Sequence, residues 1–309
     1  MTAYIVEEIV APDGFARDVD RTREKTVSEV ELEAQIGTED QDDLGTTDES
    51  DFHNRLGSLA WEKRDNFGEL QGDAIFEVTP NPFTGDFSVP LMVIDDAIYD
   101  VDTTAGQIQL DDVRLGDYTI KEIISPLQYT LDDDVTRQES VTEENLNAVV
   151  GHQDVDDSGD SDESDFHNRL GSLAWEKRDH EGRLLGGATF LIEPDPFDQT
   201  SHRTIQDNDP DDVDQREGRV QIINVFLDDY TITETKPPPG FARDFDLTRR
   251  ESVTKGNLNA EVGQKDVDDL GNTDESDFHN RFFPISFFVA NRILFLSVCL
   301  KCFFSGNVD

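Results

Sequence analysis

Cysteine is almost absent from this chain of 309 residues, and the two that occur, Cys299 and Cys302, both lie close to its C-terminus. The remainder of the chain therefore cannot be a disulfide scaffold. The two cysteines have the C-x-x-C spacing of redox motifs, but no βαβ pattern surrounds them. We assign them no redox function.

Basic residues are also scarce, with 26 Lys and Arg against 69 Asp and Glu, so the net charge is −43. Phosphate binding needs clustered Lys and Arg, which excludes nucleic acid and anionic membrane surfaces as partners. Disordered chains can also be this acidic, but they contain few aromatic residues. Here aromatic residues make up 9% of the chain, and the apolar residues fall in strand-like runs. We expect folded domains joined by acidic loops, the charge serving either solubility or ion binding.

Long apolar runs are missing except at the C-terminal end. The first residues, MTAYIVEEIVAPDG, have neither the basic start nor the apolar stretch of a signal peptide. Residues 282–304 are mostly apolar and long enough to span a bilayer, but Asn291 and Arg292 lie in the middle of this tail. A membrane segment and a truncated or misjoined gene end both explain the tail.

Internal repeats organise the sequence. The stretch SDFHNRLGSLAWEKRD begins at Ser50 and again at Ser164, and SDFHNR begins a third time at Ser276. The copies begin more than a hundred residues apart, and a repeat unit of that length is a domain in its own right. The predicted domains are the C-terminal half of a repeat (1–54), two whole repeats (55–168 and 169–280), and the tail (281–309). Since half a domain cannot bury its apolar face, we expect residues 1 to about 45 to be poorly ordered or packed loosely on the next domain, and to be the first cut by protease.

The whole repeats are expected to be all-β. Short segments of the second repeat are rich in β-branched and aromatic residues, and Pro, Gly, Asp and Asn separate them. No segment has the period of an amphipathic helix. About seven short strands with alternating faces predict a two-sheet antiparallel β-sandwich. The segments are GSLAWEK, GGATFLIE, GRVQIINV, DYTITET, RRESVT, LNAEVG and SDFHN.

Alternation places three polar side chains inside each sandwich. In a strand, residues i and i+2 share a face, so Lys177 lies on the face of Trp175, and Asn280 on the face of Phe278. Glu234 shares the apolar face of its strand in the same way. The corresponding residues of the first whole repeat are Lys63, Glu122 and Asn168.

Two interpretations of these inward residues are open. A lone buried charge is expensive, so Lys and Glu can simply form a buried ion pair with the amide bonded to it. Alternatively, a desolvated neutral Lys is a nucleophile, and a protonated Glu can polarise the Asn amide and shuttle the proton. That reaction would join the Lys and Asn side chains through an amide with loss of ammonia.

Several motifs resemble the prealbumin-like repeats of the SpaA and Cna B-type families. They are the first-strand Lys, LLGGATF, DYTITE followed by PPGF, and the last-strand Asn. The first whole repeat departs from this pattern at LQGDAIF and SPLQY, which makes its turn uncertain. The resemblance covers both whole repeats and the half-repeat and stops at Arg281.

The resemblance implies transthyretin-like stalk modules of a bacterial surface protein, rather than an enzyme that turns over a substrate. It implies isopeptide bonds Lys63–Asn168, catalysed by Glu122, and Lys177–Asn280, catalysed by Glu234. The location would be extracellular or at the cell surface. The partner would be an unidentified extracellular protein or surface ligand, with membrane or cell wall reached only through anchoring of the parent protein.

Twelve-residue acidic runs precede each last-strand Asn and partly match a calcium loop, with Asp at positions 1, 3, 9 and 12 and Gly at 6. Position 5 lacks an oxygen ligand in two of the three runs, no flanking helices are evident, and a solvated loop explains them equally. A calcium-dependent binding module is the rival function, and calcium is the only cofactor that the sequence suggests. The candidate ligands are Asp154, Asp156, Asp160, Asp162, Asp165, Asp266, Asp268, Asp274 and Asp277.

One histidine occurs beside each of these asparagines: His53, His167 and His279. A single His cannot make a zinc site. Because each His is out of phase with the inward Asn, we expect its side chain to be exposed to solvent.

Overall fold

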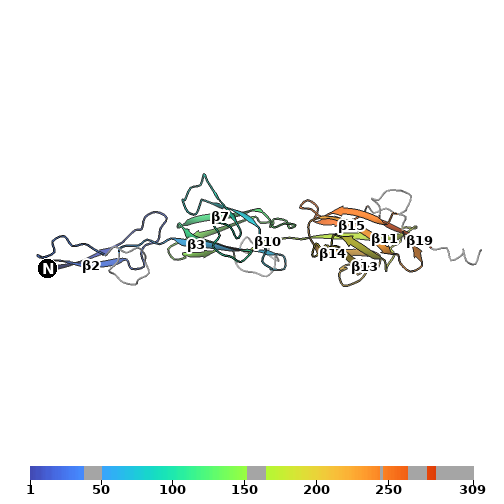
Figure 1. Cartoon of the computed structure of the whole chain (residues 1–309), viewed down its shortest axis with the longest axis horizontal. Helices are drawn as coiled ribbons and strands as arrows, with labels where there is room; N and C mark the ends of the chain where they lie inside the picture. The colour runs from blue at the N-terminus through green and yellow to red at the C-terminus, as the bar shows by residue number, and fades with distance from the viewer. Residues whose placement is uncertain (38–50, 152–164, 244–245, 264–276, 283–309) are drawn as a thin grey trace, which may run out of the picture. The chain divides into compact units, whose positions relative to one another are not determined.

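The computed structural model describes residues 1–37, 51–151, 165–243, 246–263 and 277–282. It divides into two compact units, residues 1–169 and 170–309. Within the described residues all regular structure is β-strand (Figure 1). The predicted all-β class is thus confirmed, and each unit contains a sandwich of two facing sheets.

Two four-stranded sheets build the first sandwich, within residues 1–169. In one sheet, the last strand β10 and the short strand β9 both run parallel to the first strand β3, which pairs antiparallel with β6. The other sheet is antiparallel with the order β5-β4-β7-β8. The strands are β3 (Gly57–Asp65), β4 (Ile75–Thr79), β5 (Leu91–Ile94), β6 (Gln107–Val113), β7 (Gly116–Ile124), β8 (Thr136–Val141), β9 (Asn147–Val149) and β10 (Phe166–Asn168).

The second sandwich repeats this arrangement, with β18 and β19 parallel to the first strand β11. Two of its strands, β13 and β16, were not predicted. The strands are β11 (Gly171–Asp179), β12 (Thr189–Glu193), β13 (Arg203–Gln206), β14 (Arg219–Val225), β15 (Asp229–Lys236), β16 (Phe241–Ala242), β17 (Thr248–Ser252), β18 (Asn259–Glu261) and β19 (Phe278–Phe282).

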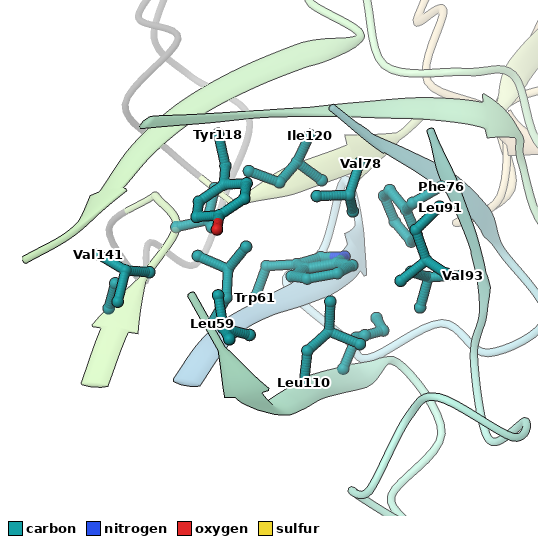
Figure 2. Packing of buried hydrophobic residues seen from close by; sticks show 14 of the residues in the cluster. Leu59, Trp61, Phe76, Val78, Leu91, Val93, Leu110, Tyr118, Ile120 and Val141 are labelled. Carbon is teal, nitrogen blue, oxygen red and sulfur yellow. The ribbon is translucent and has the colours of Figure 1, made fainter. Parts of the chain in front are cut away.

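Alternating apolar residues from both sheets fill the core of each sandwich. Figure 2 shows Trp61 and Leu59 of β3 facing Tyr118 and Ile120 of β7 in the first sandwich. These four side chains are at most 2% exposed. Burying a large apolar side chain contributes roughly 1.5–3 kcal/mol. The core therefore holds the two sheets face to face and fixes which side of each strand points inward.

The half-repeat begins with a hairpin of β1 (Thr2–Glu7) and β2 (Thr22–Val27), and all six residues of β1 are exposed. This hairpin contacts the sandwich that follows it: the Leu115 amide donates to the Gly14 carbonyl at 2.9 Å, and Arg114 lies 5.3 Å from the Phe15 ring centroid. The apolar face of the half-repeat is thus uncovered, whereas its faster proteolysis stays a prediction.

The turn after the Glu-bearing strand is kept in all three copies, although the first whole repeat lacks its glycine. Gly14 and Gly240 have φ angles of 81° and 86°, in the left-handed region that favours glycine. Gln128 occupies the same position with φ of 70°, and the Tyr129 amide donates to the Pro126 carbonyl at 3.2 Å. The first whole repeat, with SPLQY in place of the Pro-Gly motif, therefore keeps the turn, at the expense of backbone strain at Gln128.

Within the residues that the structure describes, no helix has the length and apolar character needed to cross a membrane. The apolar tail with Cys299 and Cys302 lies outside the described residues.

Candidate functional site: a buried Lys, Glu and Asn in each sandwich

The first sandwich brings together Lys63 of β3, Glu122 of β7 and Asn168 of β10. All three are at most 1% exposed. Lys63 Nζ lies 3.6 Å from Glu122 Oε1, and Asn168 Nδ2 donates to both oxygens of Glu122, at 3.0 and 3.2 Å. Lys63 and Asn168 belong to one sheet and Glu122 to the other, so the site spans the sandwich core.

The second sandwich contains the same cluster at Lys177, Glu234 and Asn280, again at most 1% exposed. Lys177 Nζ lies 3.6 Å from Glu234 Oε1, and Asn280 Nδ2 donates to Glu234 Oε2 at 3.0 Å. The inward orientation expected from alternation holds for all six side chains. Two copies with the same distances, although the Glu-bearing strands differ in sequence, indicate that the cluster belongs to the repeat.

The strand register explains why these residues meet. β10 runs parallel to β3, with Phe166 opposite Lys63, so Asn168 lies two residues further along the same inner face. Across the core, Phe76 of β4 is paired with Glu122 of β7. The ring of Phe76 lies 5.4 Å from that of Trp61 and 5.0 Å from that of Phe166. Aromatic residues are therefore the strand neighbours of this buried polar cluster.

Burial changes the acid–base chemistry of the first cluster. Desolvation lowers the pKa of Lys63 to about 8, while the carboxylates of Glu122 and Asp132 oppose this shift. A substantial fraction of the Lys63 side chain is then neutral near physiological pH, and the neutral amine is the nucleophilic form.

The amide oxygens of the two asparagines are not satisfied within these clusters. Asn168 Oδ1 and Asn280 Oδ1 are buried and have no hydrogen-bond partner among the described residues. Leaving such an atom buried costs about 1–3 kcal/mol.

Two residues that were not predicted from the sequence, Asp132 and Arg137, support the first cluster. The Asp132 amide donates to Glu122 Oε2 at 3.1 Å, and its carboxylate pairs with Arg137 at 3.0 Å. Arg137 also donates to the Asp165 carbonyl at 3.0 Å and lies 4.7 Å from the ring centroid of Phe166. This buried pair thus links the Glu-bearing strand to the Asn-bearing strand.

A recurring spacing in the sequence could have revealed this support. An Asp stands five residues before an Arg in all three copies, as Asp18 and Arg23, Asp132 and Arg137, and Asp244 and Arg249. Arg249 donates to the Asp277 carbonyl at 3.1 Å, as Arg137 does to that of Asp165, whereas Asp244 lies outside the described residues.

The calcium ligands proposed from the sequence are mostly outside the described residues, and only Asp165 and Asp277 can be placed. Asp165 pairs with Arg64 at 3.3 Å and Asp277 with Arg178 at 3.2 Å. No group of three or more candidate ligands gathers anywhere in the described part of the chain. Calcium binding by the acidic runs stays a prediction, which melting in millimolar calcium would test.

The expectation of exposed histidines was wrong, and His53 is half-buried. His167 and His279 are fully buried. In each, ring Nδ1 lies 2.9 Å from the carbonyl oxygen of the Asp two residues earlier, Asp165 or Asp277. The imidazole therefore folds back along its own strand instead of extending into solvent.

Comparison with known proteins gives structural likeness only. No family model matches the sequence, and no curated protein does. Similar solved structures include the Bacillus anthracis TIE protein, at 19% identity and a TM-score of 0.40, over 75% of this chain and 35% of that one. The chain thus spans about a third of the length of that protein.

A C-terminal fragment of the pilus adhesin SpaC from Lactobacillus rhamnosus GG is similar at 16% identity and a TM-score of 0.41, over 74% of this chain and 96% of the fragment. A streptococcal ancillary pilin is similar at 13% identity and a TM-score of 0.31, over 91% of this chain and 75% of that one. At such identities and TM-scores the likeness is no guide to function, which has to be argued from the buried clusters.

Proposed function

We propose that the chain is a load-bearing structural module of an extracellular or cell-surface protein, in which each sandwich is locked by an amide between its Lys and Asn side chains. The observation that carries the proposal is the recurrence of one buried Lys, Glu and Asn cluster, with the same distances, in both sandwiches. The family resemblance in the sequence motifs points to the same role and supplies the extracellular location.

The chemistry needs only the residues of the cluster. Lys63 passes a proton to Glu122, and its neutral nitrogen attacks the amide carbon of Asn168. The new carbon–nitrogen bond forms as the bond to Nδ2 breaks. A second proton of the Lys63 nitrogen passes to Nδ2, which leaves as ammonia, and Glu122 keeps the first proton. No oxidant or cofactor enters the balance. Glu122 lies within reach of both nitrogens, at 3.6 Å and 3.0 Å.

Each cluster can react only once, because its product is a stable amide and the protein itself is the substrate. The role is therefore structural. Closing a loop of about a hundred residues restricts the unfolded chain, which for a disulfide of that span contributes on the order of 4 kcal/mol.

The position of the bond suits a chain under tension. β3 and β10 are the first and last strands of the first sandwich and run parallel, side by side. Force entering at β3 would cross from Lys63 to Asn168 and leave through Arg169 without stretching the residues between them.

Intact-mass measurement of the purified chain tests the proposal. We expect a deficit of two molecules of ammonia relative to the sequence. Glu122→Ala should restore one molecule and Glu234→Ala the other, because an uncatalysed amine attacks an amide very slowly. A mass equal to that of the unmodified sequence would sink the proposal and leave two ordinary buried ion pairs.

A further inference from the structure

We propose that the buried pair of Asp132 and Arg137 is the positioning device of the amide-forming reaction, because it holds the strand that carries Asn168 where the Lys63 amine can reach it. Its counterparts in the other copies would act in the same way. This inference rests on the proposed function and assigns to the reaction two residues outside the cluster itself.

The strand that carries Asn168 needs such support, because β10 is an edge strand of only three residues. It lies at the end of its sheet, in the order β10-β3-β6, so among the described strands only β3 pairs with it. The other edge of such a strand presents backbone N–H and C=O groups to no neighbouring strand. Asn168 therefore depends on groups outside the sheet for a fixed position.

The pair binds the open edge of β10 as a neighbouring strand would. The His167 N–H donates to Asp132 Oδ2 at 2.8 Å, and Arg137 Nη2 donates to the Asp165 carbonyl at 3.0 Å. Residues two apart present their backbone groups to the same edge of a strand, so one carboxylate and one guanidinium hold this edge. The guanidinium also lies 4.7 Å from the ring centroid of Phe166, the residue between these two.

The same pair orients the carboxyl group of the cluster. The Asp132 backbone amide donates to Glu122 Oε2 at 3.1 Å, while Oε1 lies 3.6 Å from Lys63 Nζ. Asp132 and Arg137 lie 3.0 Å apart and are at most 6% exposed. Hydrogen bonds between ionised groups are short and strong, so the pair is itself rigidly placed. A displacement of the pair would therefore move Glu122 and Asn168 together.

The contacts of the pair recur with the Glu and Asn residues in the other copies. The residue before each Asn donates its backbone N–H to the Asp carboxylate wherever that Asp is described, in both cases at 2.8 Å: His53 to Asp18 and His167 to Asp132. The Arg donates to the carbonyl of the residue three before the Asn, at 2.8 to 3.1 Å: Arg23 to Asp51, Arg137 to Asp165 and Arg249 to Asp277.

The distance between the reacting atoms is what the pair would control. A displacement of about 1 Å can slow a reaction between positioned groups about a hundredfold. Arg137→Lys keeps the positive charge beside Asp132, but it replaces a planar fork of donors by a single ammonium. An ammonium cannot reproduce the directed contacts with the Asp132 carboxylate and the Asp165 carbonyl together. The variant should therefore fold but react slowly at the first cluster.

Time-resolved intact mass of the full chain tests the inference. The protein is made by cell-free synthesis, samples are quenched in acid at intervals, and peptide mapping assigns each loss of ammonia to one of the two clusters. The second sandwich is the reference within every molecule, because the substitution leaves it unchanged. In Arg137→Lys the first cluster should lose its ammonia about a hundredfold more slowly than in the wild type, while the second cluster keeps its rate.

A core variant of the same sandwich separates positioning from stability. Leu91→Ala opens the core at β5, the strand of that sheet farthest from β8, which carries Arg137. It should destabilise the sandwich without slowing the reaction in molecules that are folded. The folded fraction of each variant is read from Trp61 fluorescence in a Trp175→Phe background, and rates are compared per folded sandwich.

The outcomes separate this inference from the proposed function. If the wild type loses two molecules of ammonia and the first cluster of Arg137→Lys reacts at the wild-type rate, the inference is overturned alone. Equal slowing in Arg137→Lys and Leu91→Ala also overturns it, because stability would then set the rate. A wild-type chain of full mass overturns both proposals.

A second variant keeps the test decisive if Arg137→Lys leaves the first sandwich unfolded. Asp132→Asn keeps the shape of the side chain and the backbone amide that donates to Glu122, but it removes the charge that binds Arg137 and the His167 N–H. The weaker neutral contacts should slow the first cluster and leave the second unchanged. A first cluster that reacts at the wild-type rate in this variant overturns the inference.

Discussion

The two whole sandwiches share their first strand, GSLAWEKRD, residue for residue, and differ at the edge strand of the facing sheet. In the first sandwich the edge strand β5 exposes Met92 and Ile94, at 44% and 47%. In the second, the edge strand β13 places Thr204 and Gln206 at the same positions. The inward residues Val93 and Ile205 are fully buried in both.

This contrast shows which positions the fold constrains. The first strand must present Leu, Trp and Lys to a core that contains Glu and Asn, so the fold constrains its inward residues. The outer face of an edge strand touches only solvent in the isolated sandwich, so apolar and polar residues are equally compatible with folding there. Variants that change one sandwich at a time can distinguish the constrained positions at the cluster from the unconstrained outward positions of the edge strands.

Mechanical extension should show the largest difference between a locked and an unlocked sandwich. In Glu122→Ala the bond from Lys63 to Asn168 does not form, so the residues between them become free to extend. About 104 residues at roughly 3.4 Å each predict some 350 Å of additional contour length in single-molecule pulling. The second sandwich, still locked through Glu234, should add nothing.

Glu234→Ala should reverse this pattern, with the first sandwich locked and the second extensible. Glu144→Ala, at an exposed position of the first sandwich, is the control and should leave both sandwiches inextensible. An unchanged extension in Glu122→Ala would show that no covalent link carries the load.

Loss of the buried arginine should have the next largest effect. Arg137→Leu leaves the Asp132 carboxylate buried without its cation, which costs about 3–5 kcal/mol of unfolding free energy. Denaturant unfolding followed by Trp61 fluorescence, in a Trp175→Phe background, reports on the first sandwich alone. Lys121→Leu, at an exposed position of β7, is the matched control, with an expected change within about 0.5 kcal/mol. Equal effects of the two substitutions would contradict the supporting role of Arg137.

Much of the cluster could be predicted from the sequence, because strand alternation needs only residues i and i+2. Trp175 and Lys177, or Phe278 and Asn280, fix the inward face without knowledge of the partner strand. The pair of Asp132 and Arg137 was missed because its contacts depend on how β8 and β10 meet, which no local pattern encodes. His167 was misplaced for a related reason: alternation gives the direction of a side chain at Cβ, but not a ring that folds back onto its own backbone.

The pH dependence of stability should reveal the buried amine when the amide cannot form. In Asn168→Ala, Lys63 stays an amine whose pKa burial has lowered to about 8. The unfolded chain, with a Lys pKa of about 10.4, then binds more protons than the native state between pH 8 and 10, so the unfolding free energy should rise with pH by up to about 1.4 kcal/mol per unit.

Below pH 8 both states hold the proton and the slope should disappear. Because other groups titrate in this range, the measurement is the difference between Asn168→Ala and the double variant Asn168→Ala, Lys63→Met. Parallel pH profiles for these two proteins would show that Lys63 keeps its ordinary pKa in the fold.

The smallest effect on stability is expected at the edge strands. Met92→Thr with Ile94→Gln gives the first sandwich the outward residues of the second, and the unfolding free energy should change by no more than about 0.5 kcal/mol. An apolar edge is a template for pairing with another strand, so the same variant should reduce concentration-dependent association in sedimentation experiments. The reverse exchange, Thr204→Met with Gln206→Ile, should increase association through the second sandwich. If neither exchange alters association, the exposed apolar side chains of β5 are as inert as the polar ones of β13, and the difference between the two edges has no consequence for the isolated chain.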